Sequence, residues 1–177
     1  MKKTITVLVI ICVSICANFL YAQTSADAYN RNFKLGIGLS GGLPLKDPYT
    51  FNVGGDIRLQ YNISETYSLT FTTGYNNLFL EDDGVNFGYI PIKVGYKTFL
   101  FSNEFYVMAE MGGAFSVTKE YGGVNSIIFG PTLGYASKYI DFSMRYEILN
   151  DFPVIKDGVP DNGLGQIMVR LAYGFDL

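Results

Sequence analysis

The chain has 177 residues, with 13 basic and 16 acidic side chains, 14 Phe, 14 Tyr, 20 Gly and neither His nor Trp. The length suits a single domain, and the small acidic surplus argues against nucleic-acid binding, which needs basic side chains to neutralise phosphates. Without histidine there are no His-containing metal sites, no Ser-His-Asp or Cys-His nucleophile pairs and no near-neutral proton carrier. Composition therefore disfavours most enzymes, and we expect no catalytic residue, cofactor or metal centre.

Residues 1–22 have the order of a cleaved secretory signal peptide. Lys2 and Lys3 form a positive start, an apolar run covers about residues 7–17, and small Ala22 stands at the expected cleavage point. An uncleaved anchor is the first alternative, but the apolar run is short for a membrane span. The sequence thus predicts export.

Both cysteines, Cys12 and Cys16, fall inside this segment. Lipoprotein processing at Cys16 is a second alternative, which Ile15 disfavours because a small residue usually stands there. The mature chain then contains no disulfide, and removing Lys2 and Lys3 from the 13 basic residues leaves 11 against 16 acidic ones. Residues 23–32 are expected to be a polar, periplasmic lead-in.

From residue 33 to residue 177, apolar and polar residues alternate with the period of a β-strand, and no window keeps a helical period. We expect a single all-β domain over 33–177, with strands at 33–40, 51–63, 67–75, 90–97, 105–117, 127–136, 140–147 and 165–177.

The two faces of these strands differ sharply. One face holds most of the aromatic residues and no charge, whereas the other holds glycines, all the charges and, as its single aromatic residue, Tyr106. An eight-stranded barrel has an interior that side chains just fill, so the bulky apolar face does not fit inside. An apolar face of that size pointing outward would aggregate in water but suits lipid. The sequence therefore predicts an eight-stranded, antiparallel, up-and-down transmembrane β-barrel.

The charged positions of the polar face are expected in the lumen, where a buried charge needs a partner. Six basic and five acidic residues are nearly balanced, which indicates a structural network of ion pairs; a selective pore is the alternative. These residues are Lys34, Asp56, Arg58, Lys93, Lys97, Glu110, Asp141, Arg145, Glu147, Arg170 and Asp176.

Connections between the expected strands alternate in length. Short links follow the second, fourth and sixth strands, at 64–66, around 102–104 and at 137–138, and longer ones lie at 41–50, 76–89, 118–126 and 150–164. This pattern is typical of barrels in the outer membrane of Gram-negative cells, with short periplasmic turns and long external loops. Aromatic residues at both ends of the strands would form interfacial girdles.

The segments GYIPIKVGYK at 88–97, DFSMRYE at 141–147 and VRLAYGFDL at 169–177, with the Ala22-Gln23 junction, resemble a known group. The chain is similar to small outer-membrane barrels related to OmpX and OmpA, and especially to the PorT-like "outer membrane protein beta-barrel domain" proteins. The resemblance implies that the alternating C-terminal segment is read by the outer-membrane assembly machinery. Barrel enzymes such as lipid A acylases use a catalytic histidine, which this chain lacks, so we expect no enzyme.

The long connections are mostly acidic. Glu81, Asp82 and Asp83 could attract a divalent cation, which prefers carboxylate oxygens, although their spacing fits no EF-hand. Expected partners are outer-membrane lipid, lipopolysaccharide bridged through divalent ions, and an unknown protein at the outer loops, with the barrel itself a monomer.

We expect a structural or surface-interaction role for a barrel with a plugged polar lumen. Two alternatives stay open. One is a narrow channel or transporter, including a lateral conduit for small hydrophobic molecules. The other, implied by the PorT-like resemblance, is an accessory role in secretion or surface assembly.

Overall fold

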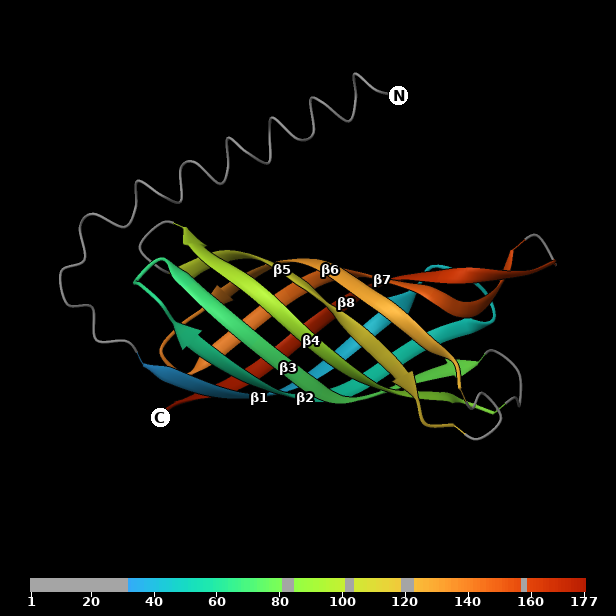
Figure 1. The fold of residues 1–177 in the computed structure, drawn as a ribbon, viewed down its shortest axis with the longest axis horizontal. Helices are drawn as coiled ribbons and strands as arrows, with labels where there is room; N and C mark the ends of the chain where they lie inside the picture. Colours follow the sequence, from blue (N-terminus) through green and yellow to red (C-terminus); the bar gives the residue numbers. More distant parts are fainter. Residues whose placement is uncertain (1–31, 81–84, 101–103, 119–122, 157–158) are drawn as a thin grey trace, which may run out of the picture. The chain divides into compact units, whose positions relative to one another are not determined.

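The computed structural model describes residues 32–80, 85–100, 104–118, 123–156 and 159–177. Eight strands account for almost all of them (Figure 1). They are β1 (Phe33–Pro44), β2 (Tyr49–Asn62), β3 (Tyr67–Leu80), β4 (Phe87–Leu100), β5 (Phe105–Ser116), β6 (Asn125–Ala136), β7 (Ile140–Lys156) and β8 (Val159–Asp176).

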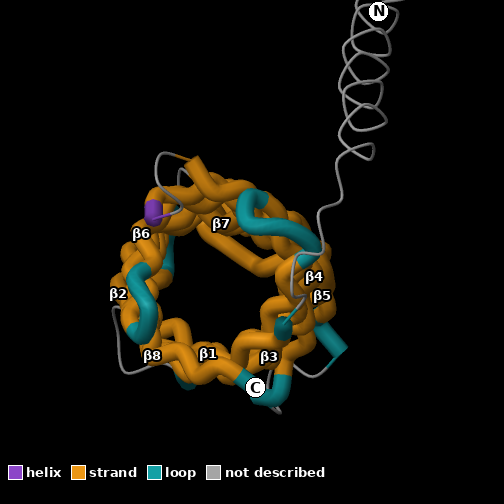
Figure 2. The backbone as a smooth tube through the Cα atoms, turned by 90° about the vertical axis from the view of Figure 1, so that its left-hand side faces the viewer, coloured by secondary structure: helices purple, strands orange, loops and turns teal. Residues whose placement is uncertain are grey.

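The strands form one closed barrel in chain order, and every neighbouring pair is antiparallel. Viewed end-on, they make a complete ring (Figure 2). The ring closes where β1 meets β8, in a register that runs from Lys34 opposite Asp176 to Pro44 opposite Gln166. The predicted fold class is confirmed.

The strands reach further than the sequence pattern indicates at one end of the barrel. We call this end the loop side, and the end with connections 63–66, 101–104 and 137–139 the turn side. On the loop side the connections are 45–48, 81–86, 117–124 and 157–158, so most of the long loops expected at 41–50, 76–89, 118–126 and 150–164 are strand.

The reason is a reversal of the alternation. Towards the loop side the outward positions become polar, as at Asn125 and Asn150, while the inward positions become apolar, as at Leu78, Ile128 and Leu149. Backbone pairing continues through this change because each ladder hydrogen bond satisfies a group that would otherwise be unpaired. A search for outward apolar residues therefore cuts the strands short at their loop-side ends, except for β5, which was expected at 105–117 and ends at Ser116.

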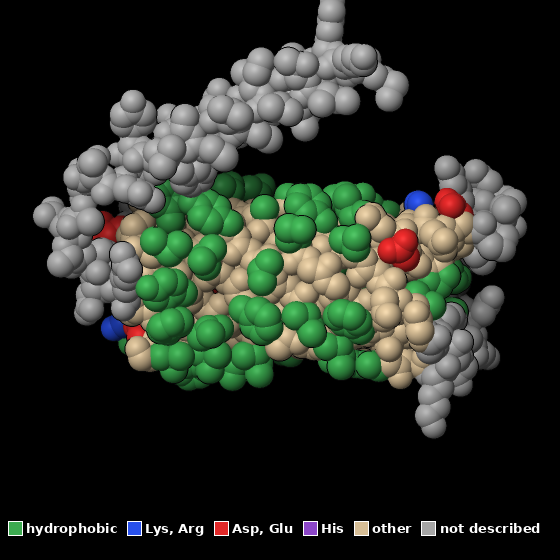
Figure 3. Space-filling view, in the orientation of Figure 1, with side chains coloured by type: hydrophobic (Ala, Val, Ile, Leu, Met, Phe, Trp, Pro, Cys, Tyr) green, Lys and Arg blue, Asp and Glu red, His purple; other side chains and the backbone are tan. Residues whose placement is uncertain are grey.

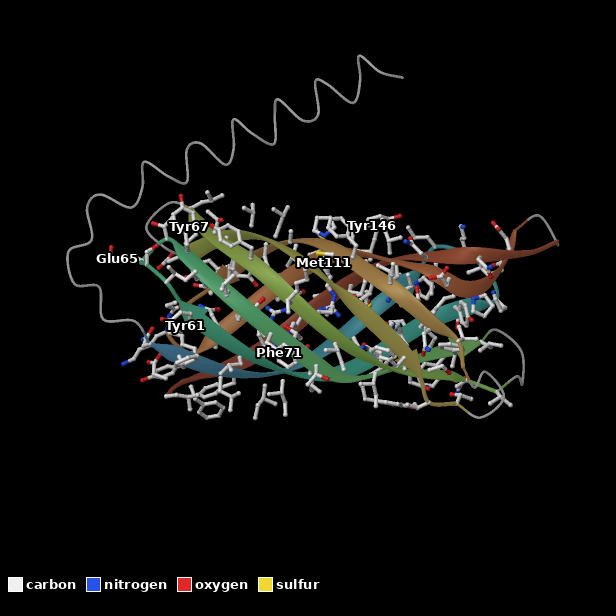
Figure 4. All side chains as sticks on the ribbon, viewed as in Figure 1. Tyr61, Glu65, Tyr67, Phe71, Met111 and Tyr146 are labelled. Carbon is white, nitrogen blue, oxygen red and sulfur yellow. The ribbon has the colours of Figure 1, made fainter. Side chains whose placement is uncertain are left out.

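The outer wall of the barrel is apolar. Glu110 and Met111 are neighbours in β5, yet the first is 1% exposed and the second 60%, as alternation across a barrel wall requires. Hydrophobic side chains cover the visible flank and charged ones lie towards its ends (Figure 3), and Phe71 and Met111 project from the middle of the wall (Figure 4). Such a belt suits the hydrocarbon of a bilayer.

Aromatic rings pair across strands near the turn side. Tyr67 stacks on Tyr96 with centroids 5.8 Å apart, and Tyr139 stacks on Tyr173 at 5.8 Å. Phe33 packs against Tyr61 at 4.8 Å. Rings at this level suit the boundary between lipid and water.

The belt gives a direct test of which face meets lipid. Met111→Arg should destabilise the barrel in lipid vesicles by about 2–4 kcal/mol, because it moves a charge into hydrocarbon near mid-height. The measurement is the urea unfolding midpoint of the refolded protein, with Met111→Leu as the matched control. An unchanged midpoint for Met111→Arg would show that this face does not contact lipid.

Candidate functional site

Nine of the eleven charges expected in the lumen face its interior, and two meet at its rim. Lys34 and Asp176 are partly exposed at the turn-side rim, where Nζ and Oδ1 lie 3.2 Å apart. The other nine come from inward positions of β2, β4, β5, β7 and β8, and all are buried except Asp141, which is partly exposed. They form two groups.

The first group, the Asp141 cluster, consists of Asp56, Lys97, Asp141 and Arg170. Asp141 receives Lys97 Nζ at 3.0 Å and the Tyr106 hydroxyl at 2.8 Å, and Arg170 Nη1 lies 3.6 Å from it. Arg170 Nε donates to Asp56 Oδ2 at 2.8 Å. Two cations and two carboxylates, contributed by β2, β4, β7 and β8, therefore meet in this group.

Glycine in β1 makes the reach of Arg170 possible. Arg170 projects from β8 and crosses over β1 to Asp56 on β2. A Cβ at Gly38 would lie 2.8 Å from the Arg170 guanidinium, closer than such atoms approach in proteins. A side chain at Gly38 would therefore have to displace the Arg170 guanidinium.

The second group, the Glu110 cluster, consists of Arg58, Lys93, Glu110, Arg145 and Glu147. Arg58 Nη2 lies 3.1 Å from Glu110, and Lys93 Nζ bridges Glu110 at 3.7 Å and Glu147 at 3.1 Å. Arg145 Nε lies 3.0 Å from Glu147. Both carboxylates share Lys93, so the arrangement is one of mutual neutralisation across the lumen.

Neutral polar side chains complete both ends of this cluster. The Thr72 hydroxyl accepts from Arg58 Nε at 3.0 Å and donates to Glu110 at 2.9 Å. On the loop side, Glu147 accepts from Gln166 Nε2 at 2.8 Å and from the Tyr89 hydroxyl at 3.3 Å. Tyr89 thus connects the Glu110 cluster to the apolar side chains on its loop side.

Above the charges, the lumen is filled by apolar side chains, which we call the plug. The Phe152 ring packs 4.6 Å from Phe87 and 5.1 Å from Tyr89, centroid to centroid. The Tyr49 hydroxyl donates to the Pro153 carbonyl at 2.9 Å, which ties β2 to the start of the β7–β8 hairpin. The plug comprises Tyr49, Leu78, Phe87, Tyr89, Ala114, Ile128, Leu149, Phe152, Val154 and Leu164, none more than 5% exposed.

The plug corrects the expectation of a polar lumen with Tyr106 as its single aromatic residue. Most plug residues continue the inward parity of their strands, as Phe87 and Tyr89 do before Lys93, so extending that parity would have found them. Phe152 and Val154 follow an irregularity in the β7–β8 register between Leu149 and Pro153, which no sequence pattern marks.

A cavity of about 330 Å³, which we call the vestibule, lies at the turn-side end. Exposed Glu104, Ser137 and Lys138 stand at its mouth, and Arg58 and Arg170 stand among its buried lining residues. The vestibule therefore borders the charged region on the turn side, while the plug covers it on the loop side.

A second hollow, of about 620 Å³, opens on the apolar outer wall. The β6–β7 register runs from Phe129–Ile148 to Thr132–Arg145 without pairs between, at Pro131, which has no N–H to donate. Pro131 and small Ala109 lie in this hollow, and its lining also includes Tyr96, Val107, Met108, Leu133, Met144, Arg145, Tyr146 and Ile167.

Other expected sites are not brought together. Glu81, Asp82 and Asp83, the candidate cation site, lie outside the described residues. Within the described ranges, no group of three or more Asp, Glu, His or Cys side chains could hold a metal ion. The described part of the chain also contains no helix that is long and apolar enough to cross a membrane.

Comparisons with known proteins identify the architecture. No protein-family model matches the sequence, and no curated protein matches it. Ail, the attachment invasion locus protein of Yersinia pestis, has a similar structure, with a TM-score of 0.53 and 14% identity over 82% of this chain and 99% of that one. The N-terminal β-barrel domain of OprF from Pseudomonas aeruginosa gives 0.53 and 12% over 82% and 100%.

A de novo designed transmembrane β-barrel gives a TM-score of 0.51 and 12% identity over 80% of this chain and 95% of that one. At such identities the similarity shows the fold alone: an eight-stranded antiparallel closed barrel of the kind that spans membranes. It assigns no PorT-like membership.

The charge network gives the second test. Glu110→Gln should lower the free energy of unfolding by about 3–5 kcal/mol, because it leaves Arg58 and Lys93 buried with one fewer carboxylate. Asp176→Asn, which removes the exposed rim pair with Lys34, should change it by less than about 1 kcal/mol. Urea unfolding in vesicles measures both, and equal effects would refute the distinction between lumen and rim.

Proposed function

We propose that the protein is an integral outer-membrane barrel with a closed lumen, which acts as a surface scaffold rather than a channel or an enzyme. The observation that carries this proposal is the plug: ten almost fully buried apolar residues seal the loop side above the paired charges. Ions would have to cross a dry apolar layer, where an unpaired charge is very costly.

Location in the outer membrane is supported by three features. The apolar belt suits hydrocarbon, residues 1–22 have the order of a signal peptide, and the fold is similar to that of Ail, an outer-membrane protein that has been placed in a phospholipid bilayer. The lipid and lipopolysaccharide of that membrane are then its surroundings, and the assembly machinery is its partner during insertion.

The surface role is supported by the β7–β8 hairpin. β7 and β8 have 17 and 18 residues, against 12–14 in the other strands, and the hairpin reaches beyond them at the right of Figure 1. Its inward residues Phe152 and Leu164 are held in the plug, while Asp151 and Asp161 are exposed. A rigid base with an exposed acidic flank suits contact with a protein partner outside the cell.

A bilayer experiment tests the closed lumen. The purified protein in planar bilayers should pass no steady current, because the plug and the charge network together fill the lumen. Heat-modifiable migration on a detergent gel, with outer-membrane fractionation, confirms that folded barrel is present. A steady current that Arg58→Ala or Glu110→Ala abolishes would establish a channel, and a soluble periplasmic protein would refute the membrane location.

The hollow in the outer wall favours a second candidate function, the handling of small hydrophobic molecules taken from the bilayer. It combines an apolar lining with an interrupted ladder beside Thr132, whose hydroxyl is buried without a hydrogen-bond partner among the described atoms. A small apolar molecule with one polar group would match this lining.

Filling the hollow tests this candidate. Ala109→Phe should weaken binding of a small apolar fluorescent probe in protein-containing vesicles about tenfold, close to 1.4 kcal/mol. Ile57→Phe, a similar change on the exposed wall of β2, is the control. Equal probe binding by both variants and the wild type would rule the hollow out as a site.

A further inference from the structure

The Glu110 cluster contains three cations and two carboxylates, so it has an excess of one positive charge. The close ion pairs of Arg58, Lys93 and Arg145 are with two carboxylates, Glu110 and Glu147, and no side chain in the group is more than 4% exposed. A buried charge without a counter-charge is strongly unfavourable.

The neighbouring charges do not offset this excess. The Asp141 cluster has two cations and two carboxylates, and the rim pair has one of each. Over the described residues of the lumen, the balance is therefore five cations against four carboxylates.

Arg58 is the cation of the Glu110 cluster that also borders the vestibule. Its Nε donates to Thr72 and its Nη2 to Glu110, but Nη1 is buried with no hydrogen-bond partner among the described atoms. Arg58 also lines the vestibule, together with Lys97 and Arg170. One donor of a buried guanidinium thus lacks a hydrogen-bond partner, in a residue that borders a cavity together with two further cations.

We propose that the inner end of the vestibule binds a small monovalent anion, a halide ion or a carboxylate group, against Arg58 Nη1. Such an anion would accept the remaining hydrogen bond and supply the missing negative charge, and charge-assisted bonds of this kind are strong. A single charge matches the excess of one, and the vestibule volume of about 330 Å³ accommodates a small anion with water. The site opens on the turn side, so it does not depend on whether the loop side conducts.

Bromide is the probe for the full-length mature protein, refolded in detergent and kept free of other halides. Crystals grown with bromide should show a bromine anomalous peak within about 3.5 Å of Arg58 Nη1. The urea unfolding midpoint should be higher in bromide than in gluconate at equal ionic strength, because a ligand bound only by the folded state stabilises it. Acetate is the parallel arm: protection by acetate as well as bromide would extend the site to carboxylate groups, and protection by bromide alone would restrict it to halides.

Arg58→Gln should abolish both the peak and the bromide effect. It leaves two cations with two carboxylates, so the variant has no charge reason to misfold. Lys93→Met removes the excess positive charge of the Glu110 cluster but keeps Arg58 Nη1. It should weaken bromide binding at least about tenfold. Lys34→Gln, which removes a cation from the vestibule rim, should bind as the wild type does. Equal wild-type midpoints in bromide, acetate and gluconate, with no anomalous peak at Arg58, would overturn the proposal.

Discussion

The rest of the structure depends on the small interior of an eight-stranded ring. Side chains from opposite walls meet at the centre, so the size and charge of each inward residue must match those of residues on other strands. Long charged residues such as Arg170 are accommodated because β1 presents glycine and serine beneath them. The bulky apolar residues that do not fit inside form the outer belt. The small interior volume thus determines which residues face the lumen and which face outward.

The polarity of the two faces is coupled along the barrel axis. Where the outside is apolar, the inside holds the two ion clusters; towards the loop side, where the outside becomes polar, the inside holds the plug. The change is gradual, because the outward neighbours of the plug residue Ile128, Ile127 and Phe129, are still apolar and exposed. Burial of apolar side chains holds the strands together at the plug, whereas ion pairs join strands across the lumen on the turn side of it.

Much of this could be predicted from the sequence. Alternation, together with the small interior volume of an eight-stranded ring, predicted the closed barrel and its outward face. Of the eleven charges expected in the lumen, nine face its interior, and Lys34 and Asp176 lie at its rim. Partners could not be predicted: that Lys93 bridges Glu110 and Glu147, or that Arg170 reaches Asp56 across β1, follows from the register of non-adjacent strands. The plug was missed because its residues lie where alternation reverses, and Phe152 lies beyond a register irregularity. The PorT-like resemblance rests on generic segments, and no family model matches the chain.

The seam between β1 and β8 has a consequence for how the barrel comes into being. It joins the first strand to the last, and the Leu177 amide donates to the Phe33 carbonyl at 2.9 Å, so the two ends of the barrel sequence are neighbours in space. Until β8 is in place, β1 and β7 each present an unpaired edge, and such edges recruit other chains. Closure pairs two strands from opposite ends of the barrel sequence, so the entropy cost of bringing them together comes before their contacts stabilise the barrel. A partly built barrel therefore exposes strand edges that promote aggregation. Another molecule has to cover these edges until the ring is complete.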